Sequence, residues 1–209
     1  MSKIFVIGFN KTATTTFHKL FLENKLKSQH SVVWKPNQFR CFSDCGDLNN
    51  FKKLDKKYPS ATFILNIRSL DKWLISRIAH GYRVYLENHK PNWAYPCNAN
   101  KCKSLIEKRE KHHLELLKHF KDRPRKLIIV NIEKDNWEDY ISTLLGFNVK
   151  NVPPQNVNKI NNDKNPSVFQ SIGNAFKKLK YNEYEKKNIL LRNGNLASKY
   201  IKIYRNNIL

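Results

Sequence analysis

"IFVIGFNKTATTT", residues 4–16, is the part of the sequence that most strongly indicates the fold. It begins with an apolar, β-prone run and continues through Gly8 and Lys11 into four threonines within five positions. A continuous apolar run is typical of a central strand that is buried on both faces of a parallel sheet. A loop of small residues that leads into a helical pattern is typical of a strand–turn–helix unit. We therefore predict a buried first strand, a tight loop and a helix.

The same alternation of short β-prone runs and helical patterns continues outward from this stretch. Strands are predicted over residues 3–9, 31–35, 61–68 and 125–132. Helices are predicted over 51–58, 70–87, 105–120 and 136–146. A further helix is predicted over 16–26, with its apolar face formed by Phe17, Leu20, Phe21 and Leu22. Residues 89–103, rich in Pro, Asn and aromatic residues, predict a long ordered loop or lid.

The pattern as a whole predicts one α/β domain over residues 1–209, with a central parallel sheet flanked by helices. Residues 151–166 predict a loop rich in Pro and Asn, and residues 167–209 predict basic helices. No apolar segment reaches the length of a membrane span, and the N-terminal residues lack a secretory cleavage pattern. We therefore expect a cytoplasmic protein without a membrane span.

Charge is the most unusual bulk property of the chain. Its 39 Lys and Arg against 17 Asp and Glu give a formal net charge of +22. Such a field favours anionic partners, such as nucleotides, sulfated sugars, nucleic acid or a membrane surface. Lysines are spread along the whole length without a basic arm. We therefore favour a solvated surface over a nucleic-acid interface and do not expect nucleic acid as a partner.

Four cysteines form two loose pairs, Cys41 with Cys45 and Cys97 with Cys102. Zinc sites usually have two residues between paired cysteines, whereas these pairs have three and four, so no metal site is predicted. A local disulfide between Cys97 and Cys102 stays open as an alternative. A cytoplasmic location favours reduced thiols.

The loop after the first strand has the chemistry of an anion site. Backbone N–H groups at a helix start attract anions, Lys11 adds a positive charge, and hydroxyl donors come from Thr12, Thr14, Thr15 and Thr16. The alternative is an ordinary turn with a threonine as helix cap. The density of donors favours phosphate or sulfate binding. The nucleotide loop of NTP-binding proteins does not fit, because it requires Gly-Lys-Ser/Thr at its end.

The order of residues in "GFNKTATT", 8–15, resembles the 5′-phosphosulfate loop of sulfotransferases that use 3′-phosphoadenosine-5′-phosphosulfate (PAPS), Gly-x-x-Lys-Thr/Ser-Gly-Thr-Thr. Ala13 stands where that pattern usually has Gly, and we expect it to hold the turn with a negative φ. A second match is "FILNIRSLDKWLISR", in which Ser76 follows Arg68 by eight residues. This spacing resembles the 3′-phosphate site of the same family. The resemblance covers about residues 3–162, and residues 163–209 carry no motif.

The resemblance implies transfer of a sulfuryl group from PAPS to a hydroxyl or amine, with adenosine 3′,5′-bisphosphate (PAP) as the product and no metal. Lys11 would stabilise the leaving phosphate, and Arg68 and Ser76 would bind the 3′-phosphate. The implied donor-binding set is Asn10, Lys11, Thr12, Ala13, Thr14, Thr15, Thr16, Arg68 and Ser76. The acceptor would be a glycan or small molecule, and an anionic one suits the basic exterior.

The acceptor must also lose a proton, which requires a histidine or carboxylate base. Asp44 is our choice, because it follows the second predicted strand and should lie at the carboxyl edge of the sheet; a helix-capping role is the alternative. The other candidates are Asp47, His18, His30, His80 and His112. Aromatic residues that could line an acceptor cleft, or simply pack the lid, are Tyr82, Tyr85, Trp93 and Tyr95.

Two other functions are weighed against the sulfotransferase. A small-molecule kinase would use ATP and magnesium, but it lacks the Gly-Lys-Ser/Thr triplet, and only Glu133 and Asp135 follow the fourth predicted strand. A relative that binds the nucleotide without turnover is consistent with Ala13 and the unidentified base. Binding of PAP against ATP with magnesium discriminates the enzyme from the kinase.

Overall fold

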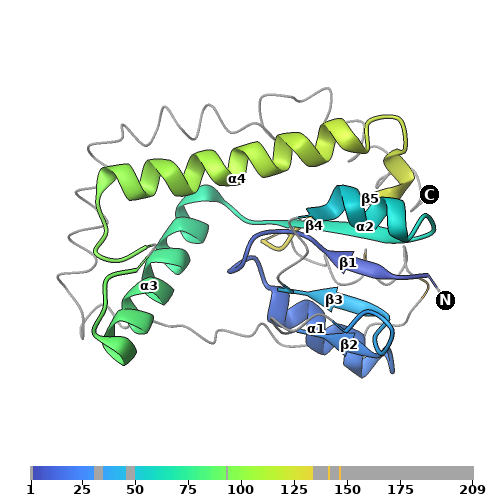
Figure 1. Cartoon of the computed structure of the whole chain (residues 1–209), viewed down its shortest axis with the longest axis horizontal. Helices are drawn as coiled ribbons and strands as arrows, with labels where there is room; N and C mark the ends of the chain where they lie inside the picture. Colours follow the sequence, from blue (N-terminus) through green and yellow to red (C-terminus); the bar gives the residue numbers. More distant parts are fainter. Residues whose placement is uncertain are drawn as a thin grey trace. The chain divides into compact units, whose positions relative to one another are not determined.

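The computed structural model describes residues 2–30, 35–45, 50–92, 94–133, 141 and 146. The elements are β1 (Ile4–Val6), α1 (Thr14–Glu23), β2 (Ser28–Gln29), β3 (Cys41–Ser43), α2 (Phe51–Lys57), β4 (Thr62–Ile67), α3 (Leu70–Asn88), α4 (Ala99–His119), the 3-10 turn η2 (Pro124–Lys126) and β5 (Leu127–Asn131). Figure 1 follows them along the chain. The helices and the loops predicted beyond residue 134 fall outside the described residues, apart from Ile141 and Gly146.

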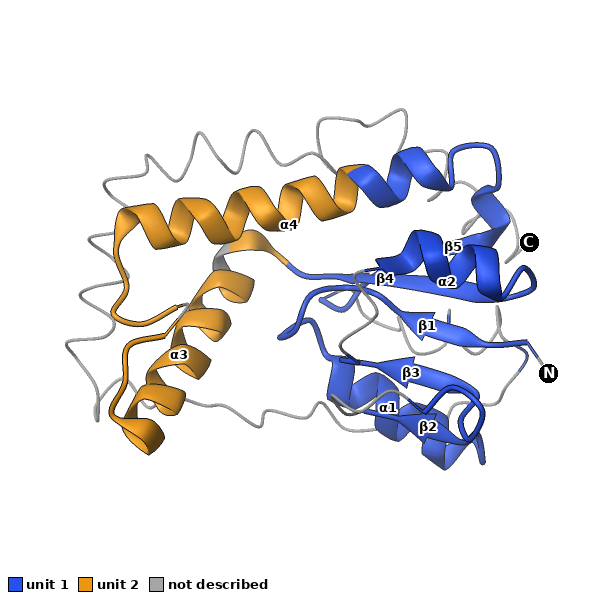
Figure 2. Cartoon of the chain, viewed as in Figure 1, with its two compact units in different colours: residues 1–68, 115–155, 193–209 blue, residues 69–114, 156–192 orange. Residues whose placement is uncertain are grey.

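The chain forms two compact units, coloured separately in Figure 2. Unit 1 comprises Met1–Arg68, Glu115–Gln155 and Asn193–Leu209, and it contains the sheet. Unit 2 comprises Ser69–Leu114 and Asn156–Arg192, and its described part is α3, the following loop and most of α4.

The sheet in unit 1 has five strands in the order β2-β3-β1-β4-β5, and all of its pairings are parallel. This arrangement confirms the predicted α/β class and the parallel sheet. The central position of β1 places Ile4 between Cys41 and Thr62. The predicted strand over 31–35 falls mostly outside the described residues, while β3 forms where only a loop was expected. Three residues are too short to carry a periodic signal.

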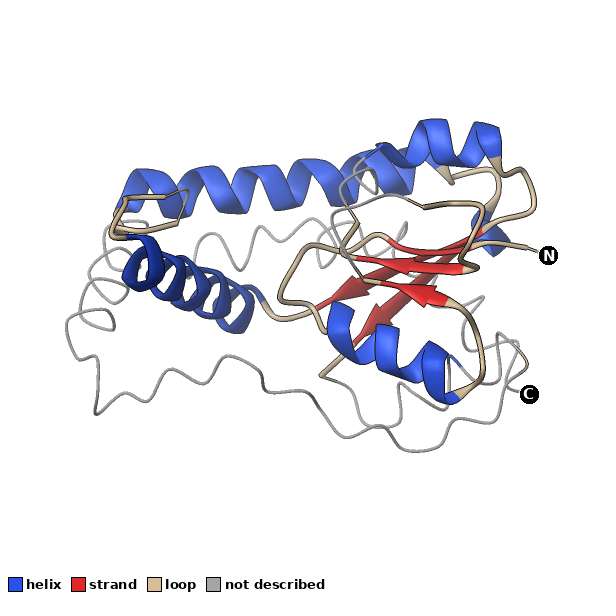
Figure 3. Cartoon of the chain, turned by 60° about the horizontal axis from the view of Figure 1, so that its bottom comes forward, coloured by secondary structure: helices blue, strands red, loops and turns tan. Residues whose placement is uncertain are grey.

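Each face of the sheet is covered by different side chains of the same strands. On one face, Ile4, Val6, Ile64 and Val130 pack with Phe17, Leu20 and Phe21 of α1; Figure 3 shows α1 along this face. On the other face, the Phe5 ring lies 5.3 Å from the rings of both Phe42 and Phe63, and Phe120 lies 5.0 Å from Phe63. Burial on both sides explains the continuous apolar run of β1.

One detail of the predicted α1 face was wrong. Leu22 was placed with Phe17, Leu20 and Phe21, but its surface is 48% exposed. Phe17, Leu20 and Phe21 form the stripe of the helix that faces the sheet. Leu22 is the next residue around the helix after Phe21 and points away from that stripe.

A buried carboxylate joins three parts of unit 1. The side chain of Asp55, on α2, is 4% exposed and lies 2.8 Å from His119 Nε2 and 2.7 Å from Arg123 Nη1. Lys126 Nζ also donates a hydrogen bond to it. Burial by itself would raise the pKa of Asp55, but these hydrogen bonds outweigh burial and lower it. The carboxylate therefore ties α2 to the end of α4 and to η2.

In unit 2, the loop over residues 89–98 packs closely against α3, in keeping with the predicted ordered loop. A Cβ on Gly81 would lie 2.6 Å from the Ala94 Cβ, so glycine permits the contact. Asn92 Nδ2 donates to the Gly81 carbonyl at 2.6 Å, and the Tyr95 ring lies 4.9 Å from the rings of both Tyr82 and Tyr85.

The loop is shorter than predicted, because α4 begins at Ala99 and not after residue 103. Asn98 starts the helix early: its Oδ1 accepts the backbone N–H of Lys101 at 2.9 Å. Among the described residues, no helix combines the length and the apolar composition needed to cross a membrane.

Candidate functional site

A buried asparagine holds the loop between β1 and α1 in shape. Asn66, on β4, is 0% exposed, and its Oδ1 accepts the Gly8 N–H at 2.9 Å. Its Nδ2 donates to the Thr12 carbonyl and, at 2.7 Å, to the Thr12 hydroxyl. A Cβ on Gly8 would lie 2.1 Å from Asn66 Oδ1, so only glycine allows this approach. The loop is therefore fastened at both ends to the neighbouring strand.

We expect Asn66→Ala to lower the free energy of unfolding by about 3 kcal/mol, because it removes three hydrogen bonds and leaves buried backbone groups without partners. Urea denaturation measures this. Asn131→Ala is the matched control, since Asn131 ends the adjacent strand β5, is partly exposed and accepts one hydrogen bond, from the Glu133 N–H. Equal losses in the two variants would show that Asn66 does not fasten the loop.

The loop reaches α1 through two residues in the left-handed region, Lys11 with φ 72° and Ala13 with φ 67°. The expectation of a negative φ at Ala13 was therefore wrong. The tertiary contacts of the loop impose a left-handed conformation, which glycine adopts easily. For alanine this conformation costs about 1 kcal/mol of strain. This is the position at which the sulfotransferase pattern usually has Gly.

Ala13 is also the N-cap of α1, and it has no side-chain hydrogen bond to the helix. The alternative of an ordinary turn capped by threonine is therefore not what the structure has. The first N–H groups of a helix have no intrahelical acceptors. The methyl group at the cap accepts none of these N–H groups, and they lie at the end of the helix dipole that favours anions.

We expect Ala13→Gly to raise the free energy of unfolding by about 0.5 kcal/mol, since glycine relieves the strain at φ 67° but gains entropy in the unfolded chain. Thermal and urea denaturation measure the change. The control Ala79→Gly, inside α3, should instead lower stability by about 1 kcal/mol or more. A loss of stability in Ala13→Gly would argue against the left-handed conformation.

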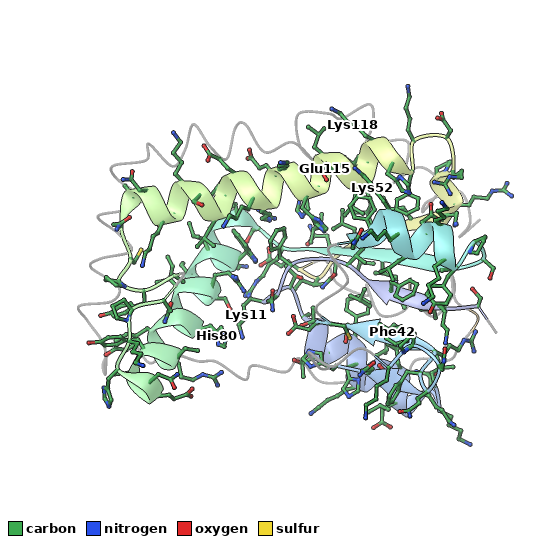
Figure 4. All side chains as sticks on the ribbon, in the orientation of Figure 1. Lys11, Phe42, Lys52, His80, Glu115 and Lys118 are labelled. Atoms are coloured by element: carbon green, nitrogen blue, oxygen red, sulfur yellow. The ribbon has the colours of Figure 1, made fainter. Side chains whose placement is uncertain are left out.

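The four threonines of the loop and helix start lie in different surroundings. Thr12 is buried, its hydroxyl donates to the Phe9 carbonyl, and it accepts from Asn66, so it belongs to the frame of the loop. The hydroxyls of Thr14 and Thr15 both lie 3.4 Å from His30 Nε2. Thr16 is buried on α1. Lys11 lies on the same loop (Figure 4), and it is partly exposed.

Asp44 lies beside this loop. It directly follows β3, which pairs with β1, and it accepts a hydrogen bond from Asn10 Nδ2. Its Oδ2 lies 3.7 Å from His30 Nε2. Asp44 therefore opens at the same edge of the sheet as the loop, as predicted, although the strand that carries it is β3. Asp44, His30 and the hydroxyls of Thr14 and Thr15 form one polar cluster.

Arg68 directly follows β4 and belongs to unit 1. Its Nε lies 3.3 Å from Glu133 Oε1, two residues beyond the end of β5. Both side chains are partly exposed, so this ion pair is open to competition from a bound anion. Ser76 is the seventh residue of α3 and belongs to unit 2.

The other base candidates lie in different surroundings. His18 Nδ1 is 2.9 Å from the Ser28 hydroxyl, and burial, then His30 and Lys19, lower its pKa. His80 lies 3.2 Å from Arg83 Nη2, and the His112 ring lies 6.3 Å from that of His113, all within unit 2. Asp47 and Trp93 fall outside the described residues.

Sequence reasoning missed two residues of this site. Asn66 is the one polar side chain within the apolar run "FILNI" of β4, and that exception was the available signal. Glu133 was considered only as a ligand for magnesium, and no local pattern pairs it with Arg68, 65 residues away.

The described residues contain no group of three or more His, Cys, Asp or Glu side chains that could hold a metal ion. Comparison with known proteins adds no assignment: no family model and no curated protein matches the chain.

Proposed function

We propose that the protein is a sulfotransferase that uses PAPS and transfers its sulfuryl group to a hydroxyl or amine. One observation carries the proposal: the loop that contains Lys11 is fastened to Asn66 on the adjacent strand β4. Arg68 follows Asn66 by two residues, just after the end of the same strand. Two cationic side chains thus follow neighbouring parallel strands at one edge of the sheet, where α/β proteins bind ligands. A nucleotide with phosphates at both ends suits two such positions.

In the proposed reaction the acceptor oxygen or nitrogen attacks sulfur while the bond from sulfur to the 5′-phosphate oxygen breaks. Negative charge then develops on the departing PAP, where Lys11 and the N–H groups at the start of α1 stabilise it. The hydroxyls of Thr14 and Thr15 bind the remaining oxygens. Arg68 binds the 3′-phosphate. Ser76 enters the proposal only through its spacing from Arg68.

The acceptor proton goes to the pair formed by Asp44 and His30. A carboxylate beside an imidazole orients the ring and stabilises the charged form that results from proton transfer. The distance of 3.7 Å between them and the contact of His30 with both threonine hydroxyls support this assignment. Either group of the pair can be the immediate base.

Thermal denaturation with nucleotides tests the proposal. PAP at about 100 times its dissociation constant should raise Tm by roughly 5 to 10 °C, since binding to the folded state adds about 2.7 kcal/mol. Adenosine 5′-phosphate, which lacks only the 3′-phosphate, should shift Tm less at the same concentration. If Tm rose with ATP and magnesium but not with PAP, the sulfotransferase proposal would be wrong and the kinase would be favoured.

Arg68→Ala sharpens this experiment. It should remove the difference between PAP and adenosine 5′-phosphate, because Arg68 is proposed to contact only the phosphate that distinguishes them. Arg125→Ala, an exposed arginine in η2, is the matched control and should preserve the difference. Incubation of labelled PAPS with glycans, phenols and steroids then separates an enzyme from a relative that only binds the nucleotide.

A further inference from the structure

Two cysteines of unit 2 lie in contact where the loop over residues 89–98 meets α4. The sulfur atoms of Cys97 and Cys102 are 3.5 Å apart. Cys97 is the half-buried residue before the cap Asn98, and Cys102 is buried in the first turn of α4, where its N–H donates to the Asn98 carbonyl at 3.0 Å. The helix cap therefore holds both thiols in one short segment.

The other two cysteines have a different environment. Cys41 is buried in β3, and burial raises the pKa of its thiol to about 12. The buried Cys45 thiol lies 3.5 Å from the Ser43 carbonyl and 3.7 Å from the Gln29 carbonyl. Both thiols are buried, which restricts the access of a small disulfide to either sulfur.

We propose that Cys97 and Cys102 are a redox-active dithiol that forms a reversible disulfide by exchange with a small disulfide such as oxidised glutathione. The Cys97 thiolate attacks one sulfur of the small disulfide, forms a mixed disulfide and releases one thiol. Cys102 then attacks the Cys97 sulfur, loses its proton to solvent and releases the second thiol. Two protein thiols and one small disulfide become one protein disulfide and two small thiols.

The surroundings favour Cys97 as the attacking sulfur. The hydrogen bond from Cys102 lowers the pKa of Cys97 against the opposing effect of burial, and the nearby Lys101 lowers it further. Cys102 is buried and is placed to resolve the mixed disulfide. To form the disulfide, the two sulfurs must approach from 3.5 Å to bonding distance, about 2.05 Å.

The disulfide would close a ring over residues 97–102 and fasten the end of the loop to α4. The same loop is already held to α3 at Asn92 and Tyr95. Oxidation therefore restricts opening of the loop over residues 89–98, whose Tyr95 ring contacts the Tyr82 and Tyr85 rings of α3. This inference does not depend on the proposed sulfuryl transfer.

The test is incubation of the full-length protein with oxidised glutathione, followed by alkylation and peptide mass spectrometry. We expect one disulfide that joins Cys97 to Cys102, reversed by dithiothreitol, with thiol loss at Cys97 about tenfold or more faster than at Cys41 and Cys45. Hydrogen exchange over residues 89–98 should slow in the oxidised protein and recover on reduction.

Single variants identify the order of events. Cys102→Ser should accumulate a stable mixed disulfide at Cys97, whereas Cys97→Ser should react little, and Cys45→Ser should still form the internal disulfide. Thiols at Cys97 and Cys102 that persist as long as those at Cys41 and Cys45 would overturn the proposal. The proposal would also be overturned if, in the protein without substitutions, oxidation linked Cys97 mainly to other molecules. This second measurement tests the pair even if a variant fails to fold.

Discussion

Replacing Lys11 by alanine should slow the proposed sulfuryl transfer by about a thousandfold. The ammonium group is the one cation on the loop fastened to Asn66, and a preorganised donor at a developing negative charge is typically worth a hundredfold to a thousandfold in rate. The measurement is release of PAP from labelled PAPS with and without acceptors. The effect should fall mainly on kcat, because the charge on the leaving phosphate grows in the transition state.

Lys53→Ala is the charge-matched control. Lys53 is an exposed lysine on α2, and its removal lowers the net charge by the same amount without touching the loop. Its rate should stay within about twofold of the original protein, apart from a small change in electrostatic attraction of the nucleotide. Full turnover by Lys11→Ala would remove the assigned role, and equal losses in both variants would reduce it to bulk charge.

Replacing Asp55 by asparagine should lower the free energy of unfolding by about 3 kcal/mol and Tm by roughly 10 °C. The carboxylate is buried against His119, Arg123 and Lys126. Asparagine has nearly the same shape, so the change isolates the loss of charge and leaves Arg123 and Lys126 without their counter-charge. Asp122→Asn, an exposed aspartate nearby, should change stability by less than about 0.5 kcal/mol.

The same carboxylate predicts a dependence on pH. The folded protein lowers the pKa of Asp55, so its contribution is fully present above the unfolded pKa of about 3.9 and is lost as pH falls through the folded value. Urea denaturation from pH 7 to pH 3 should therefore show the difference between Asp55→Asn and the original protein shrinking below about pH 4. A difference that stays constant over this range would contradict the lowered pKa.

The strand–loop–helix unit and the α/β class were open to prediction because they depend on local patterns. An apolar run such as "IFVI" reports burial on both faces, and helical spacing in α1, α3 and α4 reports one buried stripe. The carboxyl-edge position of Asp44 follows from parallel topology alone. Short elements were not predicted because they carry too little pattern: the three residues of β3 show no periodicity that could be detected.

Local sequence patterns were enough to predict the parallel α/β fold and to place Lys11, the threonines and Arg68 just after strands. Three features became visible only in the folded chain: Asn66 fastens the loop, Ala13 has a left-handed conformation, and Arg68 pairs with Glu133. The reason is sequence separation: these contacts join residues 54 to 65 positions apart. Local periodicity reports which side of an element is buried, but the partner of a buried amide or a charged side chain is set by how strands order themselves in the sheet.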